Sequence, residues 1–344
     1  MLASLLSLSA ALPASIHADN SWISLDFGSL AQNFWPATFD GLTFGAIYAL
    51  VALGYTLVYG VLNLINFAHS EVFIMGCYGV FFTLSALGFG PSAPNLSIWA
   101  IVFNLCLAMI VGMVFSVVTA FVVERVAYRP LRRRGASRLA FLITAIGASF
   151  TIQYLLFNIP ATGPNAEPAV TMFIPTPVFQ VFGAIIDSQQ LTIVIAAVVM
   201  MIATDQYIRR TRVGRGIRAV AQDPDTATLM GVNKDRIIVT TFVIGGILAG
   251  AAALFYVMKV PSGVIYNGGF VLGIKAFAAA VLGGIGNVRG ALLGGLLIGV
   301  IGNYGQLLLG DSQWTDVVAF IVLVLVLLVR PSGILGQSLG RSRA

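Results

Sequence analysis

GLTFGAIYALVALGYTLVYGVL, residues 41–62, contains 22 consecutive residues without an acidic or basic side chain. An α-helix needs about 20 such residues to cross the hydrocarbon core of a bilayer, whereas buried helices of soluble domains are usually shorter. The stretch therefore predicts a transmembrane helix, and comparable stretches recur along most of the chain.

Composition extends this prediction to the whole protein. Of the 344 residues, 58% are hydrophobic and only 9% are charged, whereas soluble domains carry about 25% charged residues. Gly, Pro and short basic loops separate the apolar runs, which is typical of helices and not of the alternating strands of a membrane barrel. We expect an all-α, polytopic integral membrane helical bundle of eight or nine segments. Hydropathy places them near residues 42–62, 64–87, 98–123, 139–159, 190–206, 237–259, 272–285, 291–309 and 314–330.

The distribution of basic residues predicts the orientation of this bundle. Of the 19 Lys and Arg residues, all but Lys259 and Lys275 fall in segments that alternate to one face, namely 124–138, 207–236, 286–290 and the tail after residue 329. By the positive-inside rule this face is cytoplasmic, and the C-terminus lies there too. The net charge of +6 is therefore explained by topology and does not predict nucleic-acid binding.

The two ends of the chain are expected to flank one membrane domain at residues 39–337. Residues 1–38 form an N-terminal extension, and residues 338–344 form a cytoplasmic tail. Residues 1–18 are apolar but lack the basic start of a signal peptide, so a cleaved signal, a short extra helix and a misassigned start are alternatives. The Pro-rich loop 160–189 is expected to be an external connector or a docking rim for an external partner.

A polar cluster opens the segment 64–87. Its members are Asn63, Asn66, His69, Ser70 and Glu71. In a helix that begins at Leu64, Glu71 lies about 10 Å along the axis, where an ionised carboxylate is costly unless it meets water or a partner. Asn66 and Ser70, four residues apart, would share a face. The cluster predicts either a hydrogen-bonded network that joins helices or part of the lining of a translocation path.

The segment 272–309 carries two further signals. Its glycines recur at four-residue steps (Gly286, Gly290 and Gly294, then Gly295 and Gly299), which predicts a stripe where helices pack closely. The GNVRG loop around Arg289 would alternatively join half-helices that line a pathway. Lys275, near the expected outer start of its segment, is predicted either to extend to the membrane interface or to pair with a carboxylate.

VGRGIRAVAQDPDTATLMGVNKDRI, residues 213–237, is a polar island between apolar segments. Asp225 is predicted to cap a short helix that Gly231 ends. Such a helix would lie on the cytoplasmic surface, since the island falls on the basic face.

This short helix would display an apolar face made of Leu229, Met230 and Val220. Apolar side chains exposed among charged ones favour a docking surface for a partner over a solvated loop held at the headgroups by arginines. We expect the surface to include Arg218, Asp223, Asp225, Thr226, Ala227, Leu229, Met230 and Gly231.

Motifs for catalysis are missing from the sequence. A phosphate-binding loop requires G-x-x-x-x-G-K-[ST], and the nearest stretch, residues 268–275, has an additional residue before Lys275. There is no G-x-S-x-G elbow, since the sequence match GQSLG at 336–340 lies at the start of the expected tail and not between a strand and a helix. Two histidines do not make a zinc-peptidase motif. We expect no catalytic residue, no metal site and no cofactor bound by this chain.

Several long stretches resemble the branched-chain amino-acid ABC transporter permeases of the LivH type, in order from about residue 40 to 337. They are GLTFGAIYALVALGYTLVYGVLNLINFAHSEVFIMG at 41–76, RVAYRPLR at 125–132, GRGIRAVAQDPDTATLMGVNKDRI at 214–237, KAFAAAVLGGIGNVRGALLGGLLIG at 275–299 and RPSGILG at 330–336. The resemblance implies a second homologous permease, two ATPase subunits that bind ATP and Mg²⁺, and a periplasmic or extracellular solute-binding protein.

The resemblance also assigns roles and reveals departures. The island resembles the loop that docks on an ATPase, whose motif is E-A-A-x-x-x-G. Here Asp225, Thr226, Ala227 and Gly231 keep the spacing, with Asp in place of Glu and Thr in place of Ala. Ser70 stands where the family's N-F-A-H-G-E motif has Gly.

Our hypothesis is a multi-pass permease of a bacterial plasma (inner) membrane that imports branched-chain or other neutral amino acids. ATP binding to partner subunits would move the helix at 223–231 as a rigid lever. The alternatives are a same-family importer of urea, short amides or another small solute, and a stand-alone secondary transporter or channel. The last class usually needs more ionisable groups in the membrane than Glu71 and Lys275.

Overall fold

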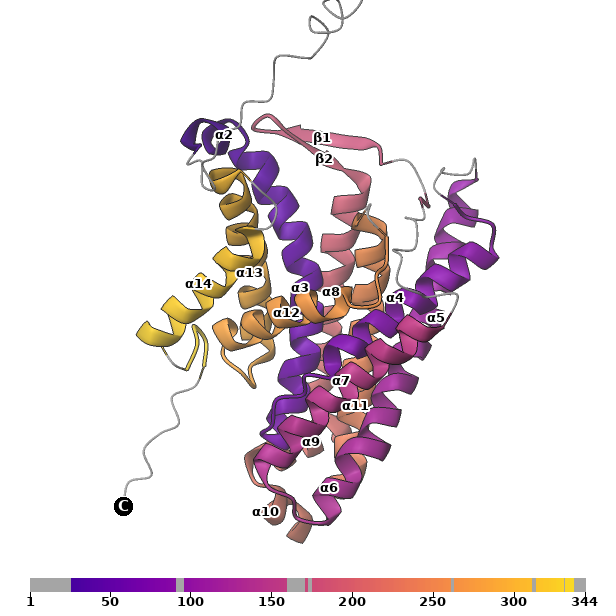
Figure 1. Ribbon diagram of the computed structural model, residues 1–344, viewed down its shortest axis with the longest axis vertical. Helices are drawn as coiled ribbons and strands as arrows, with labels where there is room; N and C mark the ends of the chain where they lie inside the picture. The colour runs from indigo at the N-terminus through magenta and orange to yellow at the C-terminus, as the bar shows by residue number, and fades with distance from the viewer. Residues whose placement is uncertain are drawn as a thin grey trace, which may run out of the picture.

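The computed structural model describes residues 26–90, 96–159, 171–172, 175–260, 263–310, 314–330 and 332–336. These residues form an elongated helical bundle with one small β-hairpin (Figure 1). In chain order the elements are α2 (Phe27–Gln32), α3 (Phe34–Leu62), α4 (His69–Ala86), α5 (Ile98–Val122), the π-helix η1 (Val123–Tyr128), α6 (Arg129–Arg133), α7 (Arg138–Asn158), β1 (Pro177–Val181), β2 (Ala184–Asp187), α8 (Ser188–Arg210), α9 (Arg212–Gln222), α10 (Pro224–Leu229), α11 (Lys234–Lys259), α12 (Gly268–Gly283), α13 (Val288–Leu309) and α14 (Trp314–Val329).

The predicted polytopic helical bundle is confirmed, because each predicted membrane segment overlaps one of these helices. Among the described residues, six helices are long and apolar enough to cross a membrane, and α12 and α14 are shorter apolar helices. Two predicted segment boundaries are wrong. The predicted loop 124–138 is largely a helical continuation of α5 through η1 and α6, and the second segment begins at His69 instead of Leu64.

The helices form a buried centre and an exposed shell. The most apolar windows of α3 and α11 are 83% and 72% buried, whereas those of α5, α7 and α8 are at most 33% buried. Apolar side chains that point outward from a membrane bundle meet lipid at no cost, since hydrocarbon is the surrounding solvent there. The shell helices therefore face lipid or a neighbouring subunit, and α3 and α11 organise the interior.

Close packing of α3 against α13 depends on the predicted glycine stripe. A Cβ at Gly45 would lie 2.8 Å from the Cα of Leu296, and one at Gly295 would lie 2.6 Å from the Cα of Ala49. Only residues without a side chain allow backbones to approach this closely. The interpretation of the stripe as a packing surface is confirmed for its members in α13, Gly290, Gly294, Gly295 and Gly299. It is wrong for Gly286, which lies in the turn between α12 and α13 with nothing within 4 Å of a Cβ, and the rest of the GNVRG segment leads into α13.

The two ends of the bundle differ in character. The segments α6 and α10 lie at the lower end in Figure 1, whereas α2 and the hairpin lie at the upper end. The predicted external loop 160–189 contains this antiparallel hairpin, with Phe179 opposite Ile186. The predictions for residues 1–18 and for the tail at 338–344 fall outside the described residues.

The segment before the tail folds back on α12. The amides of Ile334 and Leu335 donate to the carbonyls of Leu282 (2.8 Å) and Gly283 (3.1 Å). The Asn287 side chain donates to the Leu335 carbonyl at 2.9 Å. These bonds satisfy carbonyls that the end of a helix leaves unpaired, so the RPSGILG stretch holds the end of α12 in place.

Candidate functional site

The helix α10, Pro224–Leu229, is fixed at its start by Asp223. The Asp223 carboxylate accepts from the backbone amides of Asp225 (2.9 Å) and Thr226 (3.0 Å) and from the Thr226 hydroxyl (2.6 Å). Pro224 occupies the first helical position, where its missing N–H is not needed. The prediction that Asp225 is the cap is wrong by two residues, and the Asp-Pro pair was the signal for the true cap.

The hydrogen bonds that Asp223 accepts also change its acidity. Donation from the Thr226 side chain, and then from the amides of Thr226 and Asp225, lowers the pKa of the Asp223 carboxyl below its ordinary value. A lowered pKa means that the carboxylate form is bound more favourably than the acid form. The cap is therefore strongest when Asp223 is ionised.

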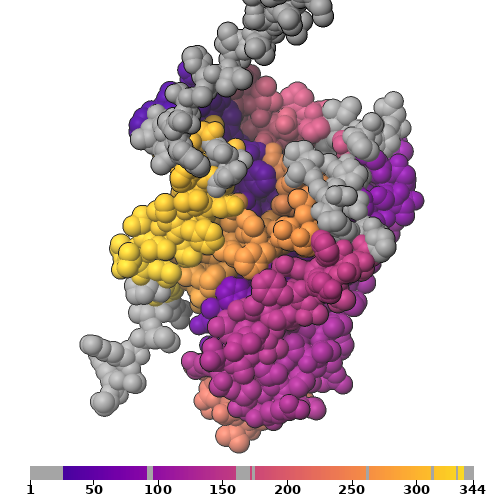
Figure 2. All heavy atoms as spheres, in the orientation of Figure 1, coloured from indigo at the N-terminus to yellow at the C-terminus, as the bar shows by residue number. Residues whose placement is uncertain are grey.

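The surface of α10 is apolar where it meets solvent. Leu229 and Met230 are 87% and 81% exposed, whereas Ala227 is buried and anchors the helix to the body. The region around α10 forms the lower end of the molecule in Figure 2. A groove of about 540 Å³ runs beside the helix between Thr228, Leu229 and Asp235. We call α10 with Met230 and this groove the docking surface.

Two residues predicted for this surface lie elsewhere. Val220 is fully buried in the core, so it does not contribute to the exposed apolar face. Arg218 donates to the carbonyls of Ile208 and Arg209 at the end of α8, and therefore holds α9 against α8. The prediction that Gly231 ends the helix agrees with its left-handed φ of 84°, one residue after the cap position of Met230.

A buried ionic network lies directly behind the docking surface. Glu124, in the π-helix η1, is fully buried and accepts from Arg132 at 3.1 Å, and Arg129 lies 3.7 Å away. Arg132 also donates to Asp235 at 2.9 Å, and Asp235 lines the groove. We call Glu124, Arg129, Arg132 and Asp235 the Glu124 network. It joins the α5–α6 rod to the start of α11 and thus to the docking surface.

The Glu124 network does not follow from the sequence. Arg132 and Asp235 are 103 positions apart in the chain, and their meeting depends on the tertiary fold. The available signal was a single carboxylate, Glu124, between an apolar run and the basic stretch RVAYRPLR, because a charge that is buried requires a partner. The π-helix itself is a second sign, since such turns often occur at functional sites.

The same π-helix reaches the predicted polar cluster. The Tyr128 hydroxyl donates to Asn66 Oδ1 at 2.8 Å, and both residues are buried. Asn66 precedes α4 and is not on its surface, so the prediction that Asn66 and Ser70 share a helical face is wrong. Asn63 is exposed and ends α3 in a left-handed conformation with φ of 53°, so it is not part of the buried cluster.

Glu71 lies in the first turn of α4 and is fully buried. Its Oε1 atom accepts from Gln153 (2.9 Å), Ser149 (3.0 Å) and Ser70 (3.2 Å). Its Oε2 atom has no hydrogen-bond partner among the described residues. The donors come from α4 and α7, so the carboxyl group joins two helices. We call Asn66, His69, Ser70, Glu71, Ser149 and Gln153 the Glu71 cluster.

His69 packs at the centre of the bundle between α3 and α11. A Cβ at Gly54 would overlap its imidazole ring, and one at Gly245 would lie 3.3 Å from Cε1. The Tyr55 ring meets the imidazole edge to face, with ring centres 4.9 Å apart. His69 therefore fills a space that two glycines create, and the described residues contain no His, Cys, Asp or Glu group that could hold a metal.

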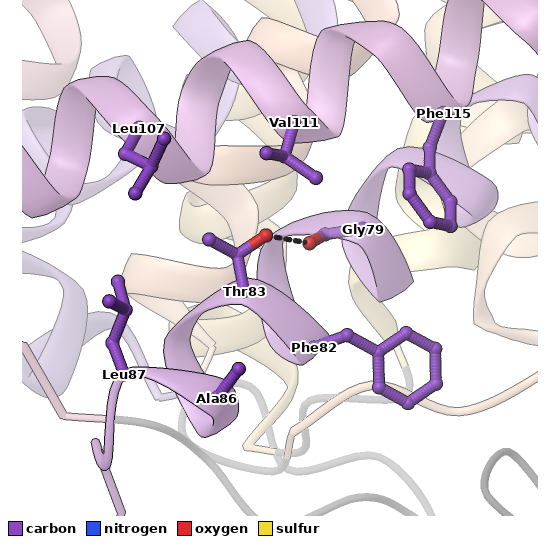
Figure 3. Close-up of a pocket in the computed structure, with 8 residues that line it drawn as sticks. All are labelled: Gly79, Phe82, Thr83, Ala86, Leu87, Leu107, Val111 and Phe115. Carbon is purple, nitrogen blue, oxygen red and sulfur yellow. Dashed lines mark hydrogen bonds between the residues drawn. The ribbon is translucent and has the colours of Figure 1, made fainter.

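A separate groove of about 380 Å³ lies between α4 and α5 (Figure 3). Its lining is apolar, with Phe82, Leu107 and Phe115 among the side chains. The Thr83 hydroxyl in this groove donates to the Gly79 carbonyl at 2.7 Å and is thereby satisfied. This lining suits hydrocarbon chains and offers no charge partner for a polar solute.

Comparison with known proteins gives the context for these features. The family model for the permease component of branched-chain amino acid transport systems matches residues 37–327. The chain belongs to this permease family. Its helical bundle is accordingly a multi-pass membrane domain, and the residues described above are features of a transport protein.

Individual relatives match over nearly their whole length. The high-affinity branched-chain amino acid transport system permease protein BraD of Pseudomonas aeruginosa is 43% identical, covering 87% of this chain and 94% of BraD. The corresponding protein LivH of Escherichia coli K12 is 39% identical, covering 88% and 96%. The fructose import permease protein FrcC of Rhizobium meliloti is 29% identical over only 39% of each chain. No solved structure matches this chain.

Proposed function

We propose that this permease is the membrane subunit of an ATP-driven importer of branched-chain amino acids. The observation that carries the proposal is that Leu229 and Met230 are exposed on a capped helix. The Glu124 network lies directly behind this helix. Apolar side chains at a polar surface require a partner, and the chain itself has no phosphate-binding loop. The partners would be two ATPase subunits, a second homologous permease and an external solute-binding protein.

The proposed coupling path begins at the docking surface. ATP-driven movement of a partner would displace α10 and the start of α11, and Asp235 would pull on Arg132 at 2.9 Å. Arg132 would move the π-helix through Glu124, and Tyr128 would carry the displacement to Asn66. Packed interiors respond to such shifts by changing between discrete arrangements. The Glu71 cluster would then change how α4 and α7 pack.

The substrate class follows the relatives that match along their whole length. BraD and LivH are both named as permeases of branched-chain amino acid transport, and they match most of this chain. The fructose permease matches only 39% of it. This difference favours neutral amino acids over sugars and other small solutes. The basic loops support an orientation with α6, α10 and the C-terminus on the cytoplasmic side of a bacterial plasma membrane.

Reconstitution tests the proposal. The chain would be purified with a second permease, two ATPase subunits and a binding protein, then placed in lipid vesicles. We expect uptake of radiolabelled leucine that requires internal ATP and the external binding protein. Uptake by this chain in vesicles without ATPase subunits would contradict the proposal and indicate a secondary transporter instead.

A further inference from the structure

Another polar region lies between α3, α11, α12, α13 and α14. It is separate from the docking surface and from the Glu71 cluster. It surrounds a pocket of about 300 Å³ with both aromatic and polar walls. This volume is at the lower end of the range of small-molecule sites. The lining includes Tyr48, Tyr256, Lys275, Asn303, Gln306 and Thr315.

Lys275 supplies a charge to this pocket. It lies in the middle of α12, so the prediction that it is near the start of its segment is wrong. Its ammonium pairs with Asp316 on α14, which confirms the predicted carboxylate partner, and lies 5.7 Å from the centre of the Tyr48 ring. A charged residue within a membrane domain is costly and usually serves a pathway or ligand.

The ion pair is placed where a zwitterion would fit. Lys275, whose side chain is 13% exposed, lines the pocket, and its partner Asp316, 38% exposed, follows the lining residue Thr315 in the chain. An α-amino acid carries a carboxylate and an ammonium group on one carbon atom. Its carboxylate would replace Asp316 at Lys275, and its ammonium group would meet Asp316 and the Tyr48 ring, because aromatic faces attract cations.

The remaining walls match the rest of such a molecule. Phe44, Val260 and Leu272 offer apolar surface to an aliphatic side chain. Asn303, Gln306 and Thr315 also line the pocket and supply two amides and a hydroxyl. The Thr315 hydroxyl bonds to Gln306 at 3.3 Å, which ties α14 to α13 across the site.

We propose that the Lys275 pocket is a substrate subsite that binds a neutral amino acid as its zwitterion, with Lys275 and Asp316 as the two charge partners. The inference rests on the proposed function, since it assumes that amino acids pass through this bundle. It adds the location of the subsite and the chemical basis of recognition. It also predicts that both charges of the amino acid are required.

A second lysine provides a matched control. Lys259 also pairs with an aspartate, Asp40, at 2.5 Å and also lies 5.7 Å from an aromatic ring, that of Phe44. Asp40 additionally accepts from Gln190 (3.4 Å) and Asn303 (3.3 Å). Lys259 does not line the pocket, whereas Lys275 does. The Lys259–Asp40 pair joins α11 to α3. It therefore serves as a control whose role is structural.

The first experiment compares uptake by the reconstituted importer at saturating binding protein. We expect Lys275→Met to lower ATP-dependent leucine uptake by about tenfold or more, which corresponds to losing one charged hydrogen bond. Lys275→Arg should restore much of the uptake, and Lys259→Met should stay within about threefold of wild type. All variants should assemble with the ATPase subunits and retain basal ATP hydrolysis.

The double variant Lys275→Met with Asp316→Leu separates recognition from folding. It replaces the pair with apolar side chains, which often preserves stability, and we expect uptake to stay low. Restored uptake would show that the pair is structural and would overturn the inference, as would equal losses in Lys275→Met and Lys259→Met. A wild-type complex that transports no amino acid would overturn the proposed function and the inference together.

The second experiment uses only the wild-type complex and so does not depend on the folding of a variant. Leucine, 3-methylbutylamine and 4-methylpentanoate would be titrated onto the solubilised complex without binding protein, with binding followed by saturation-transfer NMR. The two analogues lack the carboxylate and the ammonium group respectively. We expect leucine to bind at least about tenfold more tightly than either analogue. Equal binding of all three would contradict recognition of a zwitterion.

Discussion

The docking surface and the first turn of α4 are both polar stretches between apolar segments, but the fold treats them in opposite ways. At the docking surface Leu229 and Met230 are 87% and 81% exposed. In the first turn of α4, Ser70 and Glu71 are 2% and 0% exposed. One region exposes apolar side chains to water, and the other buries a carboxyl group among helices.

Each arrangement costs free energy unless a specific kind of contact compensates for it. Exposed apolar side chains gain stability only when a partner covers them. A buried carboxyl group needs donors within the chain, and Ser70, Ser149 and Gln153 supply them to Oε1 of Glu71. The docking surface therefore favours a partner that covers Leu229 and Met230, whereas the hydrogen bonds to Oε1 of Glu71 all come from this chain.

The Glu124 network lies between these two regions. It connects to the docking surface through Asp235 and to Asn66 through the π-helix that contains Tyr128. Three groups of residues that are far apart in the sequence thus form one continuous set of contacts. The following changes test whether the two regions differ as described and whether they communicate.

The largest effect is expected from Leu229→Asp combined with Met230→Asp. Buried apolar anchors of an interface are commonly worth about 2 kcal/mol or more each, so leucine uptake by the reconstituted importer should fall about 100-fold or more. Thermal stability of the isolated permease should hardly change, because both side chains are exposed. The volume-conserving exchange Leu229→Met with Met230→Leu is the control and should transport normally. Normal uptake by the aspartate variant would exclude these residues from docking.

Glu71→Ala should have the next largest effect. This substitution should lower the stability of the fold and should not affect docking. Ser149 and Gln153 would lose their shared acceptor, which costs about 1–3 kcal/mol. Glu71→Gln retains an acceptor oxygen and should unfold at a temperature closer to that of wild type. Thermal unfolding of the purified permease in detergent measures both. Equal melting temperatures for the Ala and Gln variants would show that the hydrogen bonds to Oε1 do not stabilise the fold.

Tyr128→Phe tests the connection between the regions. It removes the 2.8 Å hydrogen bond to Asn66, worth about 1 kcal/mol, and keeps the ring. We expect a drop of about fivefold in leucine transported per ATP hydrolysed, with assembly intact. Tyr154, which is 68% exposed on α7, provides the control Tyr154→Phe, which should be neutral. Equal transport ratios in the two variants would remove Tyr128 from the coupling path.

The smallest effect concerns the cap of α10. Because the pKa of Asp223 is lowered by donors on Thr226 and Asp225, its contribution is fully present above its ordinary pKa and is lost as pH falls through the lowered value. Hydrogen exchange of α10 amides, corrected for intrinsic rates, should show protection that is constant near neutral pH and declines only below about pH 4. Asp223→Asn should show no such decline. If protection also declined in acid in the Asp223→Asn variant, the titration of another group would be responsible.

Much of the fold was predictable from the sequence, because long apolar runs have few alternatives to a membrane helix. Each predicted segment has its helix, and Leu229 and Met230 of the polar island are exposed as expected. The local details failed where a single turn decides the conformation. Asn63 in a left-handed conformation ends α3 and delays the start of α4 to His69. Asp223 takes the capping position because Pro224 follows it.

The candidate site was predictable only in part. Burial of Glu71 and exposure of Leu229 followed from their sequence context, since one lies in an apolar run and the other in a charged one. Their partners did not follow. Ser149 and Gln153 lie 78 and 82 positions from Glu71, and no local pattern marks them as donors to a buried carboxyl group.

The sequence by itself determined the class of the protein, its helical segments and the exposure of Leu229 and Met230, because hydropathy and charge act on each stretch of chain separately. Only the tertiary structure decided which charges meet. Arg132 connects Glu124 with Asp235, and Lys275 pairs with Asp316 while Lys259 pairs with Asp40. An ion pair depends on the distance between two groups in space, and helix packing alone fixes that distance.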